Sequence, residues 1–423
     1  MAQARISHRS LVSISLNLPR CMLPLLLCFL IAAAVVPQAA EAQCLTNVNM
    51  NTWSKQGPPF NGLWTVQGGG ARVYQTRNDP PSFFISPYEL INVRITGTLR
   101  VDANVWDDDY IGFVFGYQDP LGNDSTSHDL WLFDWKRNTQ SYVNLLAPEG
   151  FHLTRINGTI NTLDQVHRYF WNHETNPPLS NCVDSLLRKH SALGAGWQPG
   201  RTYSFSLTYT SVRIEIRIDN QIIIQRTGCF QPGRFGFYNY SQEQVTYADF
   251  NYSLLADFTA DRNFICRGET VNFSSVNTTC STIPTNIKSW HWNFGDGNSS
   301  SSINPSHVFN TSGSFPVTLT ITDNYNCVDS VTKVITVSAG PPANAGPDVG
   351  ICPGDFSIIG NSTVGGVPPI TYSWTPSTGL SSTTIAQPTA SPAVTTTYTL
   401  TVTDGNGCSN SDDVTVTVHS PPT

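Results

Sequence analysis

The sequence contains few charged residues: Asp, Glu, Lys and Arg make up 13% of its 423 residues, with 30 acidic against 23 basic side chains. The net charge of -7 gives no reason to expect nucleic-acid binding. Ser, Thr, Asn, Gly and Pro are abundant and aromatic residues reach 11%, a composition typical of turn-rich all-β extracellular modules. At ~100 to 200 residues per domain, the length predicts roughly two to four domains.

The sequence also lacks the common signatures of hydrolases and zinc sites. It has no G-x-S-x-G elbow, no H-E-x-x-H motif, and no C-x-x-C or Cys/His cluster with zinc spacing. None of its seven glutamates is followed two residues later by an acid, an arrangement common in glycoside hydrolases. Glu215 lies between two isoleucines with arginines on its own face, which predicts a solvated ion pair. We therefore expect a protein that is not an enzyme.

A long apolar run occurs at Cys21–Val36, after three arginines and before an A-x-A triplet at 40–42. This order predicts a secretory signal peptide over residues 1–42, cleaved before Gln43. The run is shorter than the ~20 residues that a spanning helix needs, which argues against a signal anchor. Gln43 stands where lipidation of Cys44 would require a small residue, so we expect no lipid anchor. The protein is predicted to be secreted or displayed at the cell surface, without membrane insertion after cleavage.

An internal repeat occupies the C-terminal part of the chain, since residues 257–337 and 343–418 share a plan. Each runs from a C-x-G turn through a tryptophan strand to an alternating strand, a cysteine and a closing strand. Each is predicted to be a small immunoglobulin-like β-sandwich, with domain limits of 256–338 and 343–418.

The repeat also suggests how the cysteines pair, because export to an oxidising compartment favours disulfides among the eight that follow the cleavage site. By symmetry we predict the pairs Cys266–Cys327 and Cys352–Cys408, each tying the first strand of a module to a late strand. The remaining four, Cys44, Cys182, Cys229 and Cys280, cannot be assigned.

The stretch "WNFGDG" at Trp292–Gly297, followed by "PSHVF" and "GSFPVTLTITD", resembles the polycystic kidney disease (PKD) domain. Trp292 and Phe294 are two residues apart and are expected to face the core together. Asp296 between two glycines suits a tight turn, and this role is favoured over a metal or catalytic one. The second module lacks the FGDG turn and resembles PKD-like or immunoglobulin-like repeats of bacterial surface proteins; both modules are predicted to be spacers.

Residues 43–255 are predicted to form one large β-sandwich. "TYSFSLTYT" places Tyr203, Phe205, Leu207 and Tyr209 on one face, and "VRIEIRID" alternates in the same way. In "YIGFVFGYQD", odd-numbered Ile111 to Tyr117 are expected to fill one face, while Gly112 and Gly116 keep the other thin.

Several stretches of this segment, in order "VQGGGARVYQTRNDPPSFF", "DDDYIGFVFGYQD", "FDWKRNTQSY", "KHSALGAGW" and "RFGFYNYSQEQVTYADFNY", closely resemble the thrombospondin C-terminal domain. The resemblance covers nearly the whole segment. It implies a lectin-like jelly roll of two antiparallel sheets, calcium binding, and a role in cell or matrix adhesion.

Three consecutive carboxylates, Asp107, Asp108 and Asp109, precede the strand at Tyr110 and are the predicted metal ligands. They repel one another, and a hard cation with six to eight oxygen ligands would hold them together. From the residues alone, a solvated acidic turn is the favoured interpretation; the resemblance, carried onto these positions, favours calcium. Adjacent residues of an extended chain point to opposite sides, so all three can coordinate only if the loop curls or two ions bind.

Three further features are weaker candidates for a site. Asp134 stands inside an apolar strand and needs a partner or an ion, although the resembled family commonly has an apolar residue there. The stretch Asn172–Ser185 is predicted to be an exposed loop; a plain loop is the favoured interpretation, and the lining of a ligand groove is the alternative. Trp171 and Trp197 can stack on sugars, but burial in the core is the expected fate.

Together these observations predict an all-β, secreted, calcium-binding adhesion protein that recognises an extracellular glycan or a matrix or surface protein. The alternative is the carbohydrate-binding portion of a larger secreted glycoside hydrolase whose catalytic part lies beyond Thr423. The terminal "VHSPPT" is consistent with such a continuation. Glycosylation at sequons such as Asn157 and Asn272 depends on the host's secretory route.

Overall fold

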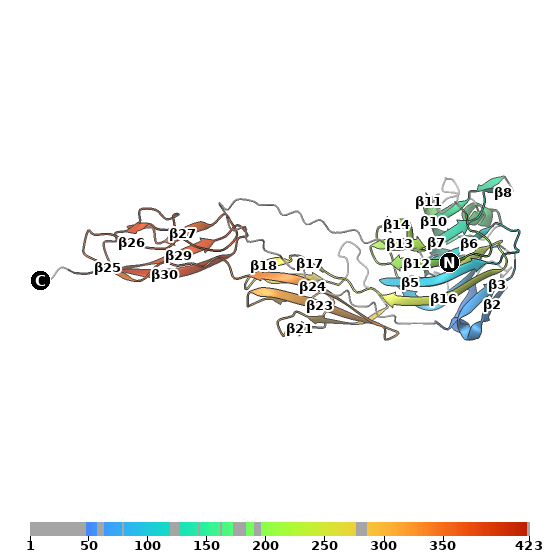
Figure 1. The fold of residues 1–423 in the computed structure, drawn as a ribbon, viewed down its shortest axis with the longest axis horizontal. Helices are drawn as coiled ribbons and strands as arrows, with labels where there is room; N and C mark the ends of the chain where they lie inside the picture. The colour runs from blue at the N-terminus through green and yellow to red at the C-terminus, as the bar shows by residue number, and fades with distance from the viewer. Residues whose placement is uncertain are drawn as a thin grey trace, which may run out of the picture. The chain divides into compact units, whose positions relative to one another are not determined.

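The computed structural model contains mostly β-strands, arranged in three successive groups of sheets (Figure 1). It describes residues 48–56, 63–77, 80–118, 127–142, 144–160, 163–171, 183–189, 196–275 and 286–420. The predicted signal peptide, Cys44, Cys182 and Cys280 lie outside these residues. Within the described ranges, no helix is long and apolar enough to cross a membrane.

The N-terminal domain consists of two seven-stranded antiparallel sheets. The first has the order β1 (Ser54–Gln56), β4 (Ser82–Leu90), β15 (Gly233–Tyr240), β6 (Tyr110–Gln118), β7 (Ser127–Lys136), β10 (Gly150–Thr159) and β11 (Val183–Lys189). The second has the order β14 (Gln221–Thr227), β13 (Arg213–Ile218), β12 (Thr202–Tyr209), β5 (Val93–Val101), β16 (Val245–Leu254), β3 (Arg72–Gln75) and β2 (Trp64–Gln67). Strands far apart in sequence are neighbours in both sheets. This arrangement is the predicted lectin-like jelly roll.

Aromatic side chains fill the space between these two sheets. The ring of Phe113 on β6 lies 4.7 Å from that of Phe133 on β7 and 5.0 Å from that of Phe205 on β12, measured between centroids. Strand β12 buries its odd-numbered residues and leaves most of the intervening ones more exposed, as the alternation in its sequence predicts. Burial of these rings, together with the aliphatic residues around them, stabilises the domain.

The outer face of the first sheet is buried as well. A short helix α1 (Leu163–Val166) continues as the π-helical turn η3 (His167–Trp171), and its aromatic residues form a second cluster with Tyr110 and Val114 of β6. The expectation that Tyr117 shares a face with Ile111 is wrong, because Tyr117 belongs to this second cluster. The pairing register of β6 shifts after Phe115, and Gly116 has φ +58°, so a bulge turns Tyr117 to the outer side.

Smaller elements complete the domain. They are the 3-10 turns η1 (Met50–Thr52) and η2 (Gly68–Gly70), and the hairpin of β8 (Gln140–Tyr142) and β9 (Leu145–Ala147).

The next module, whose strands lie within residues 259–338, is a sandwich of a three-stranded and a five-stranded sheet. The first contains β17 (Thr259–Ala260), β19 (Thr270–Ser274) and β22 (Ser306–Val308). The second has the order β18 (Phe264–Cys266), β24 (Val328–Ser338), β23 (Gly313–Asp323), β20 (Ile287–Asn293) and β21 (Ser299–Ser300). Trp292 and Phe294 are both buried in its core, as predicted.

The last module repeats this plan with fewer strands. Its larger sheet has the order β25 (Val349–Ile351), β30 (Ser409–Val418), β29 (Thr396–Thr403) and β27 (Thr371–Thr375), and β26 (Ser357–Ile358) pairs with β28 (Thr389–Ala390). Trp374 and Tyr398 lie buried in its core. The chain is therefore all-β: a jelly roll followed by two immunoglobulin-like sandwiches.

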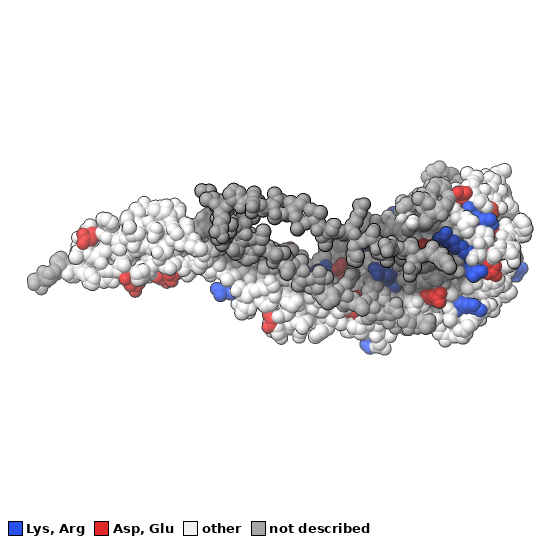
Figure 2. Space-filling view, viewed as in Figure 1, with Lys and Arg blue, Asp and Glu red and all other residues white. Residues whose placement is uncertain are grey.

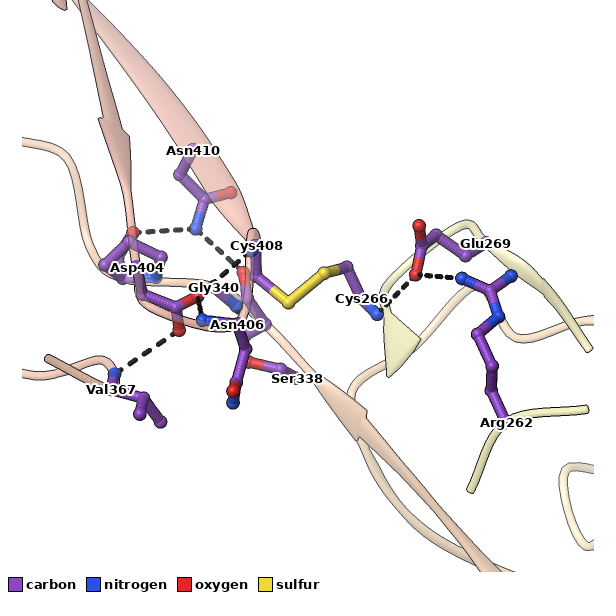
Figure 3. The surroundings of a disulfide bond; sticks show 12 residues. Arg262, Cys266, Glu269, Ser338, Gly340, Val367, Asp404, Asn406, Cys408 and Asn410 are labelled. Carbon is purple, nitrogen blue, oxygen red and sulfur yellow. Dashed lines mark hydrogen bonds and ion pairs between the residues drawn. A yellow bond between two sulfur atoms is a disulfide. The ribbon is translucent and has the colours of Figure 1, made fainter. Parts of the chain in front are cut away.

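The predicted disulfides within each repeat are wrong. Cys266 pairs with Cys408, so the bond joins the two modules, with Cα atoms 5.3 Å apart (Figure 3). Cys352 is free and exposed, and Cys327 is buried with its Sγ 3.5 Å from the hydroxyl of Tyr252. Cys229 is also disulfide-bonded.

The reason lies in the strand that separates the two cysteines of one module. Cys266 is the register partner of Ser338, at the far end of β24, whereas Cys327 immediately precedes β24. Eleven residue steps, from Cys327 to Ser338, at ~3.3 Å each place the two cysteines roughly 36 Å apart. A disulfide needs Cα atoms within about 7 Å, so the two cysteines of one module cannot bond to each other.

Candidate metal site

The three predicted metal ligands lie in the loop immediately before β6, at the end of the central strand of the first sheet. Asp107 Oδ1 accepts a hydrogen bond from the Asp108 backbone N–H at 3.0 Å. Each of the three aspartates offers one carboxylate oxygen, and these oxygens lie within 4.8 Å of one another. The three carboxylates therefore lie together, although the side-chain alternation of an extended chain would point neighbours apart.

Lys136, the last residue of β7, supplies a positive charge to this cluster. It is the register partner of Tyr110, so its side chain lies beside the loop, fully buried. Its Nζ donates to Asp109 Oδ1 at 2.7 Å, to Gln140 Oε1 at 2.9 Å and to the Asp108 carbonyl oxygen at 3.3 Å. Three acceptors match the three protons of an ammonium group.

Aromatic rings and backbone contacts fix the position of this lysine and of Asp109. Lys136 Nζ lies 4.5 Å from the ring centroid of Trp171 and 5.2 Å from that of Tyr110. Trp197 Nε1 donates to the Asp109 carbonyl oxygen at 3.0 Å. The Asp109 N–H donates to Gln242 at 3.1 Å. Asp109 is thus a structural residue, held on several sides.

Asp107 and Asp108 are more accessible to solvent than Asp109. Asp108 accepts a hydrogen bond from Asn138 at 3.0 Å and lies 3.8 Å from Lys136 Nζ. Burial, followed by the charge of Asp109, raises the pKa of Asp107 from 3.8 to about 7. The cluster therefore resists full ionisation unless a further positive charge reaches it.

The residues present fit a divalent cation. When all three aspartates are ionised, three carboxylates against one lysine leave two negative charges, which one Ca²⁺ neutralises. Carboxylate oxygens are the ligands that Ca²⁺ prefers. Asp107 and Asp108 are the side chains best placed to reach an ion, whereas Asp109 already pairs with Lys136.

Trp106 adjoins the cluster, and the residue is 98% exposed. Tryptophan is on average highly buried, and the other named candidates, Trp171 and Trp197, are buried here as expected. On the face shown in Figure 2, basic and acidic side chains are interspersed over the part of the surface that corresponds to the jelly roll in Figure 1. Among the tryptophans of the described residues, Trp106 is the exposed one.

Two predicted carboxylates have protein partners. Asp134 is fully buried, and its Oδ1 lies 3.1 Å from Nδ1 of His152 on β10. His152 is thus the partner that a carboxylate inside an apolar strand needs. Asp296 accepts from the Asn298 N–H at 3.0 Å and lies 2.7 Å from Nε2 of His307, in a turn flanked by Gly295 (φ +79°) and Gly297 (φ +93°). Asp296 is a turn residue, as expected.

Glu215 pairs with arginines, but it is buried rather than solvated. Arg217 Nε donates to it at 2.7 Å, Gln225 donates at 2.7 Å, and Arg213 also donates. Burial acts to raise the pKa of Glu215, but these hydrogen bonds and charges outweigh burial and lower it. The predicted loop Asn172–Ser185 lies outside the described residues up to 182, and its end belongs to strand β11 rather than to a loop.

Sequence comparison identifies two domains in this chain. Residues 60–255 match the family model of the thrombospondin C-terminal region, and residues 255–339 match that of the PKD domain. The chain thus carries a thrombospondin C-terminal region followed by a PKD domain. Both are domains of non-catalytic kinds, and they fit an extracellular adhesion or lectin-like role.

The curated relatives match the N-terminal domain. Human thrombospondin-2 is 28% identical over 202 residues, which cover 45% of this chain and 16% of that protein. Human cartilage oligomeric matrix protein is 28% identical over 206 residues, covering 45% of this chain and 25% of its own length. This chain therefore spans a quarter or less of these relatives.

Solved structures also match parts of the chain. The carbohydrate-binding module CBM66 from Bacillus subtilis is 11% identical with a TM-score of 0.31, covering 48% of this chain and 95% of that one. A PKD1 domain of the Vibrio cholerae metalloprotease PrtV is 28% identical with a TM-score of 0.17, covering 20% of this chain and 95% of that one.

Proposed function

We propose that this protein is a secreted or cell-surface adhesion protein whose thrombospondin C-terminal-like domain binds calcium at Asp107 and Asp108. The observation that carries the proposal is the cluster of three carboxylate oxygens, which lie within 4.8 Å of one another beside the buried Lys136. A calcium ion there would fix the loop before β6 and supply the charge that the cluster lacks. Asp109 would hold the loop in place through its ion pair with Lys136, and it would not be freely available as a ligand.

The ligand in this proposal is an extracellular glycan or a matrix or surface protein. Trp106 offers an exposed indole next to the proposed ion, and an aromatic ring of this kind has an apolar body with a polar tip. Calcium would order the loop that carries the indole, so ligand binding should depend on calcium. The two sandwich modules act as spacers in this proposal.

We expect Trp106→Ala to reduce ligand binding by at least tenfold without changing calcium binding, because its side chain makes little contact with the core. A glycan array and a panel of matrix proteins, probed with the full chain in calcium and in chelator, measure the effect. Trp131→Ala, at a buried tryptophan elsewhere in the domain, is the control for general loss of structure. Calcium-independent binding that is equal for the wild type and Trp106→Ala would contradict the proposed ligand edge. Turnover of polysaccharide by the purified chain would contradict the expectation that it is not an enzyme.

A further inference from the structure

The early cysteine has the same local structure in both sandwich modules. Ile265, before Cys266, is the parallel register partner of Val337, and Ile351, before Cys352, is that of Val418. The carbonyl oxygen of Cys266 accepts from the N–H of Glu269 at 3.1 Å, and that of Cys352 accepts from the N–H of Asp355 at 3.0 Å. Both turns contain a glycine with positive φ two residues after the cysteine. Cys352 is therefore the structural counterpart of Cys266.

The late cysteine is also equivalent in the two modules, within a D-x-x-x-C loop. Asp323 Oδ1 accepts from the Cys327 N–H at 2.8 Å, and Asp404 Oδ1 accepts from the Cys408 N–H at 3.0 Å. The aspartate N–H donates in turn to the cysteine carbonyl oxygen at 2.9 Å in both loops. Both aspartates are buried, so the loop is a fixed part of each module.

Each of these loops contacts the domain that precedes it in the chain. In the PKD domain, Asp323 Oδ2 lies 3.1 Å from the hydroxyl of Tyr252, on the last strand of the jelly roll. In the last module, Cys408 forms the disulfide with Cys266 of the PKD domain, and Asn410 Nδ2 donates to the carbonyl oxygens of Ala339 and Pro341 in the linker (Figure 3). The early cysteine of one module thus faces the late cysteine of the next.

Cys352 is the early cysteine of the last module, and it is exposed and free. Phe356, four residues later, is 67% exposed beside the same turn. We propose that Cys352 is an attachment site for a further immunoglobulin-like module that carries a D-x-x-x-C loop. The cysteine of that loop would bond to Cys352 as Cys408 bonds to Cys266, and the module would cover Phe356.

The bond forms by oxidation of two thiols to one disulfide, with release of two protons and transfer of two electrons to a disulfide-bonded oxidant such as oxidised glutathione. The late cysteines of a second copy of this chain do not fit the site. Cys408 is already bonded, and Cys327 is buried against Tyr252. The partner is therefore a module whose D-x-x-x-C loop is exposed.

The proposal can be tested by extending the chain. We would join a second copy of residues 339–423 after His419, because His419 follows Val418 as Ser338 follows Val337. The protein would be oxidised with a glutathione mixture and its disulfides mapped by mass spectrometry of unreduced peptides. We expect Cys352 to bond to the added copy's late cysteine and to become resistant to alkylation. Mutation of that late cysteine to serine is the matched control and should leave Cys352 reactive.

A second variant keeps the test decisive if the added copy fails to fold. Cys266→Ser in the present chain releases the Cys408 thiol. Because an early cysteine pairs with the late cysteine of the next module, and because β30 separates Cys408 from Cys352, Cys408 is expected to stay unbonded to Cys352. One additional alkylatable thiol per chain is the expected result. A Cys352–Cys408 bond in this variant, or a protease-resistant added copy beside a reactive Cys352, would overturn the proposal.

Discussion

Lys136→Met is expected to destabilise the protein by about 3–5 kcal/mol, because it leaves the buried carboxylate of Asp109 without its charged partner. The methionine keeps most of the apolar volume between Tyr110 and Trp171, so the loss reports the charge rather than a cavity. Urea unfolding in the presence of a chelator measures the free energy of unfolding of the variant against the wild type.

Two controls separate this buried pair from an ion pair whose basic partner is partly exposed. Asp109→Asn combined with Lys136→Met should recover much of the loss, because neither charge is then buried alone. Arg217→Met removes a partly exposed partner of Glu215, which keeps Arg213 and Gln225, and should cost about 1 kcal/mol or less. A Lys136→Met cost as small as that of Arg217→Met would show that Lys136 does not compensate a buried charge.

Asp107→Asn is expected to have opposite effects on the stability of the protein with and without calcium. The raised pKa of Asp107, about 7, means that its ionisation opposes folding. This loss of folding stability is absent at a pH below the ordinary pKa of 3.8, and it is complete at a pH above about 7. At pH 8 in chelator, the asparagine variant should therefore be more stable than the wild type, by about 1–2 kcal/mol after allowance for solvent screening.

Calcium should reverse this order, because the variant lacks a ligand carboxylate. At about 100 times its Kd, a bound ion adds about 2.7 kcal/mol to the stability of the wild type. Melting curves at pH 8, with calcium and with chelator, measure both effects, and exposed Asp413→Asn in the last module is the matched control. An equal calcium response in Asp107→Asn and in the wild type would remove Asp107 from the site.

Local patterns predicted the parts of the fold that depend on residue alternation. Tyr203, Phe205, Leu207 and Tyr209 face the core because β12 is a regular strand with one buried face. Tyr117 departs from the same logic because a bulge at Gly116 reverses the side-chain direction, and the bulge depends on neighbouring strands.

The rest of the candidate site depends on register, which the sequence does not show locally. The three aspartates stand together in the sequence, but Lys136 reaches them only because β6 and β7 pair Tyr110 with Lys136. In the sequence, the available signal for this contact was the lone lysine at the end of "FDWK". The disulfide, by contrast, could have been predicted better: the strand "VDSVTKVITVS" separates the ends of one module, so Cys266 and Cys327 could not meet.

The most direct test of the proposed function is calorimetric titration of calcium into the full chain, after chelation and dialysis, at pH 8. We predict a saturable binding heat for the wild type that disappears in the Asp107→Asn, Asp108→Asn double variant and persists in Asp413→Asn. Absence of binding heat in the wild type, or an unchanged isotherm in the double variant, would contradict a calcium site at this edge of the jelly roll.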